Sequence, residues 1–547
     1  AAAFADATTE QAANNGTISI WLDDNNISTA TVNEAITGGE AIIKGNFDQD
    51  SASTLANQIN SGSLPFALSA ESYSTISPSL GAKSLDVMVQ AGIIAFILVA
   101  ILMIVRYRLP GTIAVISLMG QAAATLAVVS GYFTVFPGST LTLPGIAGII
   151  LGIGMGVDAN VITAERIKEE LSKNKTLEGA VNSGFKMGLT PIIDGNVTIV
   201  IVAAILMGAF GPTDGFWAKV FNPIFYWFGP STAGTIYSFG FTLLTSVLLN
   251  FVFGVWATRV MIRGAVHFKP LRKAWLFGGK KEGGADFKTP SINFIGNRKK
   301  FYTFSCALIA VVLVFCGIFG VKMDVEFKGG SMITLAYEGD ADLNDLKSTI
   351  GTELGKSNLT LQTGSDISGN QTLTVTLPGS DTLTTEQLDN LLAALNEQYP
   401  DNKFVQNEVS NVDATIGKEF LLKSVVALVA ACVLILLYVA YRFRKIGGLK
   451  AGSTAIVALL HDMFVVFGVF VLLRIPLNGN FIAALLTILG YSINDTVVIY
   501  DRIRENSALY GKKQMSLAEL VNLSVNQSFA RSLMTSITTC LALGVVC

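Results

Sequence analysis

The chain has 547 residues, of which 51% are hydrophobic and only 14% are charged, and its net charge is −2. Together with a mean hydropathy of +0.53, this composition excludes an ordinary soluble globular protein and indicates an integral membrane protein. All five cysteines fall in apolar runs, so neither a disulfide framework nor a zinc-binding cluster is expected (Cys306, Cys316, Cys432, Cys540 and Cys547).

Residues 1–85 precede the first apolar run and are expected to form the second half of an α+β domain. The stretch "GTISIWLD" (16–23) predicts a strand, residues 50–60 predict a helix, and "LPFALSAESYSTISPS" (64–79) predicts extended chain. The first residues have neither the basic start nor the apolar core of a signal sequence. We therefore expect a fragment that lacks material at both ends.

Ten apolar runs of about 20 residues, the length that crosses about 30 Å of hydrocarbon, predict ten membrane helices. They cover 87–106, 111–132, 144–164, 189–210, 235–258, 301–320, 420–440, 451–473 and 481–500, and the last begins near residue 530. Lys and Arg crowd into alternate loops, which the positive-inside rule places in the cytoplasm. The polar regions 1–85 and 321–418 are then extracytoplasmic, and the second, with 15 acidic residues, six Lys and no Arg, suits a translocated domain.

Two segments between the membrane helices have a recognisable character. Residues 211–231 are rich in aromatics, Gly and Pro, which predicts an interfacial hairpin anchored by Trp and Tyr. Residues 331–411 predict the β-α-β-β-α-β order of a ferredoxin-like domain, with Thr384 or Thr385 capping its second helix. The expected strands are 331–337, 358–363, 371–377 and 403–410, and the expected helices are 342–354 and 384–398.

The sequence thus predicts a polytopic α-helical membrane protein with repeated helix bundles and extracytoplasmic α+β domains. Its parts are 1–85, the end of a first extracytoplasmic domain; 86–263, a membrane bundle of five helices; 264–300, a flexible cytoplasmic linker; 301–320, a single helix; 321–418, the ferredoxin-like extracytoplasmic domain; and 419–547, a second membrane bundle.

The two bundles are related by an internal repeat. The stretch "VDANVITAERIKEE" (157–170) aligns with "INDTVVIYDRIREN" (493–506), so that Asp158 corresponds to Asn494 and Asp495 corresponds to Ala159. Repeats of this kind, with polar residues at corresponding depths, are typical of transporters whose site lies between the halves. The one-residue offset makes the pair of aspartates asymmetric.

Charged residues inside apolar runs are the main candidates for function. An Asp or Arg at the bilayer centre costs about 2.5–3.5 kcal/mol on insertion scales, so it rarely persists without a partner or a task. Asp495 shares a helical face with hydroxyl groups, and Arg531 does the same on the next helix. With Asp158 they form the proposed proton relay. The supporting polar residues are Asn160, Asp194, Asn196, Thr198, His461, Asp462, Ser492, Asn494, Thr496, Thr535, Ser536, Thr538 and Thr539.

Structural interpretations remain open for several of these residues. Asp158 could cap a helix broken after the glycines of "LGIGMGVD" (151–158), and Arg531 could be a cytoplasmic flank that snorkels. Asp194 and Asn196 could form an interhelical hydrogen-bond knot, and His461 with Asp462 could be a neutral bonded pair. His267, in the basic linker, is expected to be solvated.

The motifs together resemble the SecD and SecF family of protein-export membrane proteins, with both members fused in one chain (SecDF). The matching stretches are "LTLPGIAGIILGIGMGVDANVITAERIKEEL" (141–171), "GNFDQDSASTLANQINSGSLP" (45–65), "TISPSLGAKSL" (75–85), "MDVEFKGG" (323–330), "ALLHD" (458–462), "ILGYSINDTVVIYDRIREN" (488–506) and "RSLMTSITT" (531–539).

The resemblance implies an RND-like accessory of the Sec translocon in the bacterial plasma membrane. It would use the proton gradient, or sodium in some relatives, to pull polypeptide outward. The implied partners are the translocon channel with its membrane subunits, unfolded preprotein and the lipid bilayer, with no nucleic acid and no cofactor beyond the coupling ion. The family's essential groups fall on Asp158, Asp495 and Arg531.

This chain departs from the family pattern at several points. Glu326 stands where Asp is usual, Gly195 stands where a small polar residue is usual, and the 211–231 segment is longer than its counterpart. The first SecD helix and the last SecF helix are not included in it. We expect these omissions to reflect a partial chain.

Two other functions share parts of this pattern. An RND-type exporter of small molecules or lipids would also have repeats and buried carboxylates, but would need an apolar, aromatic-lined cleft in its outer domains. An intramembrane aspartyl protease would need Asp158 and Asp495 within about 3 Å of each other. No other enzymatic motif is present in the sequence, so no enzyme is expected.

Overall fold

The computed structural model describes residues 2–22, 25–38, 42–45, 47–48, 51–53, 55–56, 72–133, 138–228, 234–279, 290–356, 359–365, 369–378 and 383–545. They belong to two compact units, 1–70 and 71–547. We describe each unit by itself.

The N-terminal unit contains one helix and a two-stranded hairpin. Helix α1 (Ala2–Ala13) precedes β1 (Thr17–Leu22), which pairs antiparallel with β2 (Asn25–Thr31). The strand predicted at 16–23 is therefore confirmed. Of the helix predicted at 50–60, residues 51–53 and 55–56 are helical, and the rest lies outside the described residues.

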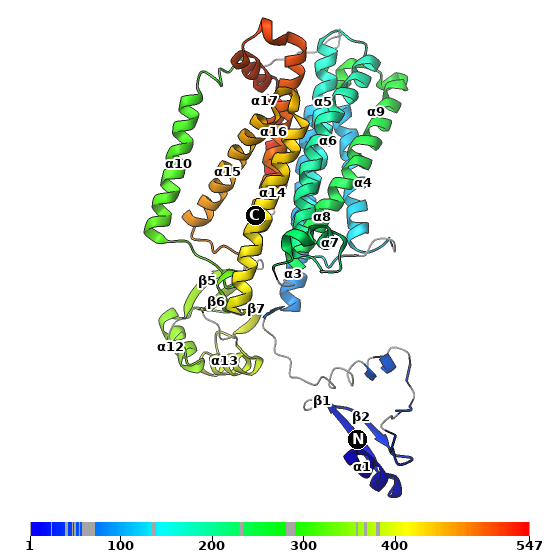
Figure 1. Ribbon diagram of the computed structural model, residues 1–547, viewed down its shortest axis with the longest axis vertical. Helices are drawn as coiled ribbons and strands as arrows, with labels where there is room; N and C mark the ends of the chain where they lie inside the picture. Colours follow the sequence, from blue (N-terminus) through cyan, green and yellow to red (C-terminus); the bar gives the residue numbers. More distant parts are fainter. Residues whose placement is uncertain are drawn as a thin grey trace. The chain divides into compact units, whose positions relative to one another are not determined.

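The second unit contains the membrane bundles (Figure 1). Nine helices among the described residues are long and apolar enough to cross a membrane, and they coincide with the nine complete predicted runs. They are α3 (Pro78–Tyr107), α4 (Leu109–Val129), α5 (Leu143–Ser172), α6 (Leu177–Phe210), α8 (Gly234–Asn250) continued through a π-helical turn (Phe251–Ala257) into α9 (Thr258–His267), α10 (Arg298–Phe319), α14 (Ala414–Arg442), α15 (Gly448–Leu472) and α16 (Gly479–Gln514).

The tenth predicted segment lies within α17 (Leu517–Gly544), which is not among those nine helices. This helix begins 13 residues before the expected start near 530, because Ser516 and Glu519 form a capping box at its N-terminus. Arg531 therefore lies in the middle of a helix.

Helices α5, α6, α16 and α17 all begin at polar capping residues. The side chains of Thr142, Thr176, Asn478 and Ser516 accept hydrogen bonds from backbone N–H groups of the first turns. These four helices come from both halves of the repeat. Helix α5 of the first half packs on α17 of the second, and α6 of the first half packs on α16 of the second.

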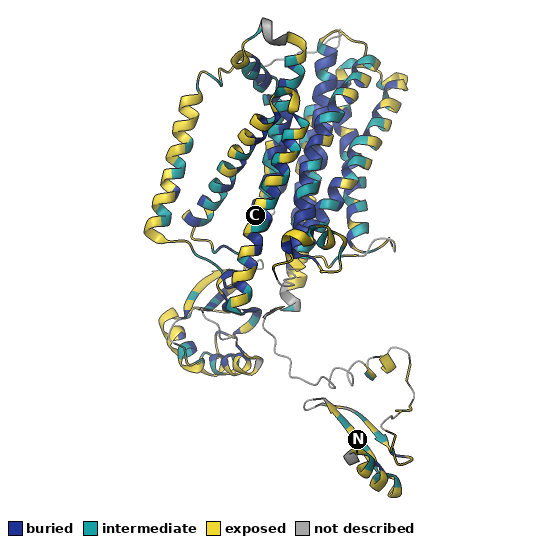
Figure 2. Cartoon of the chain, viewed as in Figure 1, coloured by how far each residue is buried: buried dark blue, intermediate teal, exposed yellow. Residues whose placement is uncertain are grey.

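Burial separates this central group from the periphery (Figure 2). In the most apolar stretch of α5, 94% of residues are buried within the protein, whereas the value for α10 is 6%. A charge on α5 therefore faces protein and not lipid, as intramembrane charges generally do.

The structure describes only part of two connecting segments, 211–231 between α6 and α8 and the linker after α9. Within 211–231, residues 216–225 form the short helix α7 (Phe216–Phe225), and Phe216, Tyr226 and Trp227 are exposed. In the linker, short 3₁₀ turns follow α9 at Lys269–Leu271 and Ala274–Phe277, and most of the glycine-rich part lies outside the described residues. The His267 side chain is 73% exposed, as expected for a solvated residue.

The outer domain is a five-stranded antiparallel sheet in the order β3-β7-β4-β6-β5. Its elements are β3 (Ser72–Ile76), β4 (Gly330–Tyr337), α12 (Leu343–Glu353), β5 (Thr360–Ser365), β6 (Gln371–Pro378), α13 (Thr385–Gln398) and β7 (Val405–Val412). The last four strands have the ferredoxin-like order, and Thr384 forms the predicted cap. Strand β3, which lies within the segment 1–85, pairs antiparallel with β7 and so covers an edge of this sheet.

A short connection, α11 (Val325–Lys328), joins this domain to the membrane helices. The Glu326 Oε2 atom accepts a hydrogen bond of 2.6 Å from the backbone N–H of Gly479, at the first turn of α16. The ring of Phe327 stacks on Phe420 of α14 at 5.5 Å. Gly329 has φ +76°, and a Cβ there would overlap Ala414, so only glycine fits. The outer domain is thus attached directly to α14 and α16.

Three carboxyl groups lie together at this connection. Burial raises the pKa of Glu326, and the nearby charges of Asp324 and Glu408 raise it further. Burial also raises the pKa values of Asp324 and Glu408. Each of these groups binds its proton more tightly in the folded protein than in the unfolded chain. Their protonation therefore stabilises the folded state most strongly below the ordinary carboxyl pKa, and this contribution is lost as the pH rises.

We predict that Glu326→Gln reduces the loss of stability as the pH rises, because it removes one of the three carboxyls whose pKa values are raised. The measurement is the thermal unfolding midpoint of the detergent-solubilised protein between about pH 4 and about pH 8. Glu338→Gln, at an exposed glutamate of the same domain, should keep the wild-type slope. Equal slopes in the wild type and Glu326→Gln would contradict the prediction.

Candidate functional site

Asp158 lies in the interior of α5, and its carboxylate contacts one residue on α16 and one on α17. Its Oδ2 atom accepts a hydrogen bond of 2.7 Å from Asn494 Nδ2 on α16, and its Oδ1 atom accepts one of 2.8 Å from Thr535 Oγ1 on α17. Because α5 runs unbroken from Leu143 to Ser172, the interpretation of Asp158 as a helix cap is wrong. Asp158 instead links the two halves of the repeat.

The other two predicted relay residues lie around this link. Asp495 on α16 interacts electrostatically with both Asp158 and Arg531. Arg531 has no ion pair within 4.0 Å among the described residues, and its buried Nη2 atom has no hydrogen-bond partner there. Because α17 begins at Leu517, Arg531 lies inside a continuous helix and not at its end. The guanidinium is therefore held near two carboxylates without direct pairing to either.

This arrangement differs from a protease dyad. Both oxygens of Asp158 are engaged by neutral donors, the Asn494 amide and the Thr535 hydroxyl. An aspartyl protease instead needs two carboxylates that share one proton. The Asp495 carboxylate, by contrast, has no hydrogen bond among the described residues.

Gly195 makes the contact between α6 and α16 possible. A Cβ at this position would overlap Asn494 Oδ1, the amide oxygen of the side chain that donates to Asp158. The family departure at Gly195 therefore has a structural reason, since any side chain would push Asn494 away from Asp158. Thr198, one turn later, bonds back to the carbonyl of Gly195 at 2.6 Å.

Asp194 takes part in a separate contact between the halves. Its Oδ1 atom accepts hydrogen bonds from Arg442 Nε at 2.6 Å and from the Tyr438 hydroxyl at 3.1 Å, both on α14. Neighbouring Asn196 is also buried, and its Nδ2 atom has no partner among the described residues. Asp194 thus forms an interhelical ion pair with Arg442, and this pair does not include Asp158.

His461, Asp462, Ser492 and Thr496 form another group, between α15 and α16. Asp462 accepts a hydrogen bond of 2.5 Å from Ser492 and lies 3.1 Å from His461 Nδ1. The side chains of His461 and Asp462 are 35% and 41% exposed. Thr496 bonds back to the Ser492 carbonyl at 3.2 Å. These residues do not touch Asp158.

The remaining supporting residues differ in burial and in hydrogen-bond partner. Asn160 donates to the Gly156 carbonyl at 2.9 Å. On α17, Thr538 is buried and bonds to carbonyls of its own helix, Thr539 is half-buried, and Ser536 is exposed. Only Thr535 of the α17 hydroxyls reaches Asp158 directly.

Sequence reasoning missed a set of charged residues at the cytoplasmic end of the interface. Arg166 and Glu169 on α5 meet Arg502 and Glu505 on α16 in a ring of ion pairs. The internal repeat could have indicated these residues, because both helices have Arg-x-x-Glu at aligned positions. It also missed Arg442 and Tyr438, the partners of Asp194, since no pattern links residues so distant in the chain.

We predict that Gly195→Ala destabilises the protein by about 1–3 kcal/mol, because the added methyl displaces Asn494 from a packed interface. Thermal unfolding in detergent measures the effect. Gly317→Ala on α10 is the matched control, since a Cβ there would meet nothing within 4 Å. If both variants unfold at the same temperature, the α6–α16 contact is looser than described.

Family models match most of the chain. The model of the C-terminal part of the protein export membrane proteins SecD/SecF matches residues 58–218 and 392–547. The model of the P1 head subdomain of SecDF matches residues 1–66.

Curated relatives and a solved structure agree with these matches. The chain is 31% identical to protein translocase subunit SecDF of Bacillus subtilis over 94% of its own length and 66% of that protein. It is 29% identical to SecDF of Brucella abortus over 97% of its length and 64% of that protein. It therefore spans just under two thirds of these relatives.

The crystal structure of SecDF from Thermus, described as a translocon-associated membrane protein, superposes with a TM-score of 0.74 at 30% identity. The superposition covers 99% of this chain and 69% of that one. The predicted fold class, a polytopic helical membrane protein with a ferredoxin-like domain, is confirmed. Because one family model alone matches more than half of its residues, the chain belongs to the SecD/SecF family of protein export membrane proteins.

Proposed function

We propose that the protein is an accessory of the Sec translocon that couples the proton-motive force to late export of unfolded preproteins across the bacterial plasma membrane. Similarity to translocase subunits supports the export role. The coupling rests on one observation, the convergence of Asp158, Asp495 and Arg531 where the two halves meet.

A proton exchanged at Asp495 changes the balance of charge at this interface. When Asp495 is ionised, Arg531 faces two carboxylates, and when it is protonated, Arg531 faces Asp158 alone. Because attraction between charges is strong in a low-dielectric interior, the two states favour different positions of α16 and α17 relative to α5. Each proton moved across 100 mV supplies about 2.3 kcal/mol for this change.

Helix α16 connects the exchange to the outer domain. Asp495 lies about 24 Å along the helix from Gly479, at 1.5 Å per residue. Gly479 is bonded to Glu326 at the base of the ferredoxin-like domain. A shift of α16 therefore moves the outer domain, which in this proposal holds the emerging polypeptide and prevents its return. The coupling ion is the proton, with sodium as the alternative.

We predict that Asp495→Asn and Arg531→Ala each abolish the stimulation of preprotein release while leaving the protein inserted and folded. Asp495→Asn removes the exchangeable proton, and Arg531→Ala removes the charge that responds to it. The assay is proton-gradient-dependent release of a secreted protein from cells or proteoliposomes that contain the translocon. Ser536→Ala, at an exposed hydroxyl on α17, should behave as the wild type.

Two outcomes would overturn the proposal. Release that is unchanged by both substitutions would exclude the relay. Transport of a fluorescent drug or lipid by the wild-type protein, with no effect on protein release, would instead identify an exporter.

We also predict that Asp158→Glu is tolerated poorly, although it conserves charge. The extra methylene moves the carboxylate within a packed helix interface, so it cannot keep both the Asn494 and the Thr535 bond. Release activity should fall at least about tenfold, which corresponds to about 1.4 kcal/mol. Activity equal to that of the wild type would show that the position of this carboxylate is not critical.

A further inference from the structure

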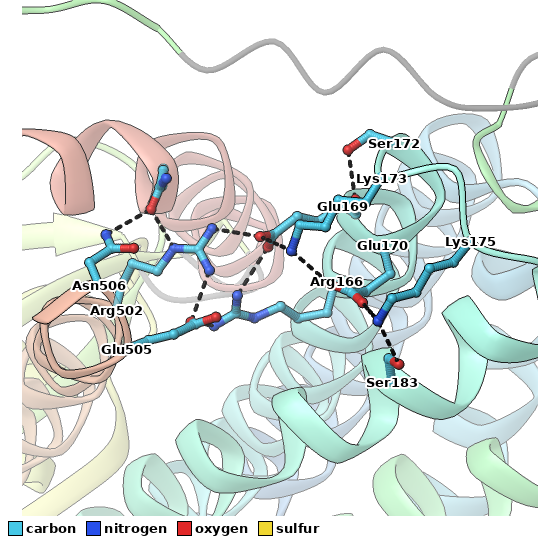
Figure 3. Close-up of polar contacts among 11 residues, drawn as sticks. Arg166, Glu169, Glu170, Ser172, Lys173, Lys175, Ser183, Arg502, Glu505 and Asn506 are labelled. Atoms are coloured by element: carbon cyan, nitrogen blue, oxygen red, sulfur yellow. Dashed lines mark hydrogen bonds and ion pairs between the residues drawn. The ribbon is translucent and has the colours of Figure 1, made fainter. Parts of the chain in front are cut away.

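Four charged side chains close the cytoplasmic end of the interface between α5 and α16 (Figure 3). Arg166 contacts Glu169 of its own helix at 3.0 Å and Glu505 of the other helix at 2.8 Å. Arg502 contacts Glu505 of its own helix at 2.9 Å and Glu169 of the other helix at 2.9 Å. We call these four residues the charge ring.

The charge ring has the symmetry of the internal repeat. Asp158 and Asn494, which touch in the bilayer, are 336 residues apart, and the same offset relates the two arginines and the two glutamates of the ring. Each arginine therefore has one partner within its helix and one across the interface. Both kinds of partner lie at equal distances, within 0.2 Å.

This double pairing determines what happens if the helices separate. The two cross-interface pairs break, but each arginine keeps the glutamate three residues later on its own helix. No charge is then left buried and unpaired, which is the outcome that would make separation costly. The ring can open and close reversibly, unlike a single buried ion pair.

Two spaces meet at the charge ring. A small cavity of about 40 Å³ is lined by three residues of the ring, Arg166, Glu169 and Arg502, and also by Arg531. This volume holds one to a few water molecules. A larger crevice of about 520 Å³ is lined by Arg166 and Glu505 of the ring and by the basic residue Lys445. Arg166 of the ring lines both spaces, whereas Arg531 lines only the smaller one.

The ring is also attached to the helix that carries Arg531. Gln527 of α17 accepts hydrogen bonds from Arg502 Nε at 2.7 Å and from Asn506 Nδ2 at 2.9 Å. Gln527 is one helical turn from Arg531. A movement of α17 that follows a change at Arg531 thus acts directly on the ring.

We propose that the charge ring is the cytoplasmic gate of the proton path. In the closed arrangement it isolates Arg531 and its cavity from the cytoplasm, and it opens when α5 and α16 part and each arginine falls back on its own helix. This inference rests on the proposed function, because it assumes that protons pass the relay.

The first test is proton leak through the purified full chain in proteoliposomes without translocon, under an imposed pH difference and with an internal pH-sensitive dye. Arg502→Gln removes one charge and one cross-interface pair, so leak should rise at least about fivefold. Adding Asp495→Asn should return the leak to the wild-type level, because the protons then lack a carrier. Lys175→Gln, which removes a charge exposed on the same face, is the control and should not leak.

A second variant tests whether the ion pairs within each helix are needed for the ring to open. Exchanging the charges, as Glu169→Arg with Arg502→Glu, keeps both cross-interface pairs but makes the α5 side wholly positive and the α16 side wholly negative. Opening then leaves every charge of the ring unpaired. This variant should not leak, yet its stimulation of preprotein release should fall at least about tenfold. Comparison with the thermal unfolding midpoint of the wild type verifies its folding.

The outcomes separate this inference from the proposed function. No leak from folded Arg502→Gln, or wild-type release by the exchanged variant, would overturn the gate while the relay stands if Asp495→Asn still abolishes release. A leak that persists in the Arg502→Gln, Asp495→Asn double variant would mean that the ring does not gate the relay. If Asp495→Asn retains release, the proposed function itself fails.

Discussion

Although the buried Nη2 atom of Arg531 has no hydrogen-bond partner among the described residues, the structure otherwise depends on the requirement that charges within a membrane have polar partners inside the protein. Asp158 meets it with two neutral donors, Asp194 meets it with Arg442, and the charge ring meets it with four mutual ion pairs. All three solutions join the first half of the repeat to the second. The polar contacts of buried charges therefore lie between the halves, where the loss of one partner would be costly.

The internal repeat explains why the contacts occur in this form. Because α5 and α16 are equivalent elements that approach across the interface between the halves, residues at aligned positions come near one another. At Asp158 and Asn494 the aligned residues differ, so this contact is asymmetric. At the charge ring the aligned residues are the same, and the result is a symmetric set of pairs. One geometry thus gives an asymmetric contact at one level of the interface and a symmetric one at another.

The outer domain is coupled to this interface by packing and one short hydrogen bond. Glu326 reaches the first turn of α16, and Phe327 stacks on α14. Strand β3 joins the same sheet from a distant part of the chain, directly before α3. The sheet therefore connects to helices of both membrane halves.

The sequence by itself determined the membrane helices, the ferredoxin-like domain and the relay candidates Asp158, Asp495 and Arg531. These follow from local hydrophobic patterns and from the rarity of charge in apolar runs. Only the tertiary structure decided the partners: Arg442 for Asp194, the addition of β3 to the distant sheet, and the cross-pairing of Arg166 with Glu505. Such contacts join residues hundreds of positions apart, and they depend on how helices pack, which no local pattern records.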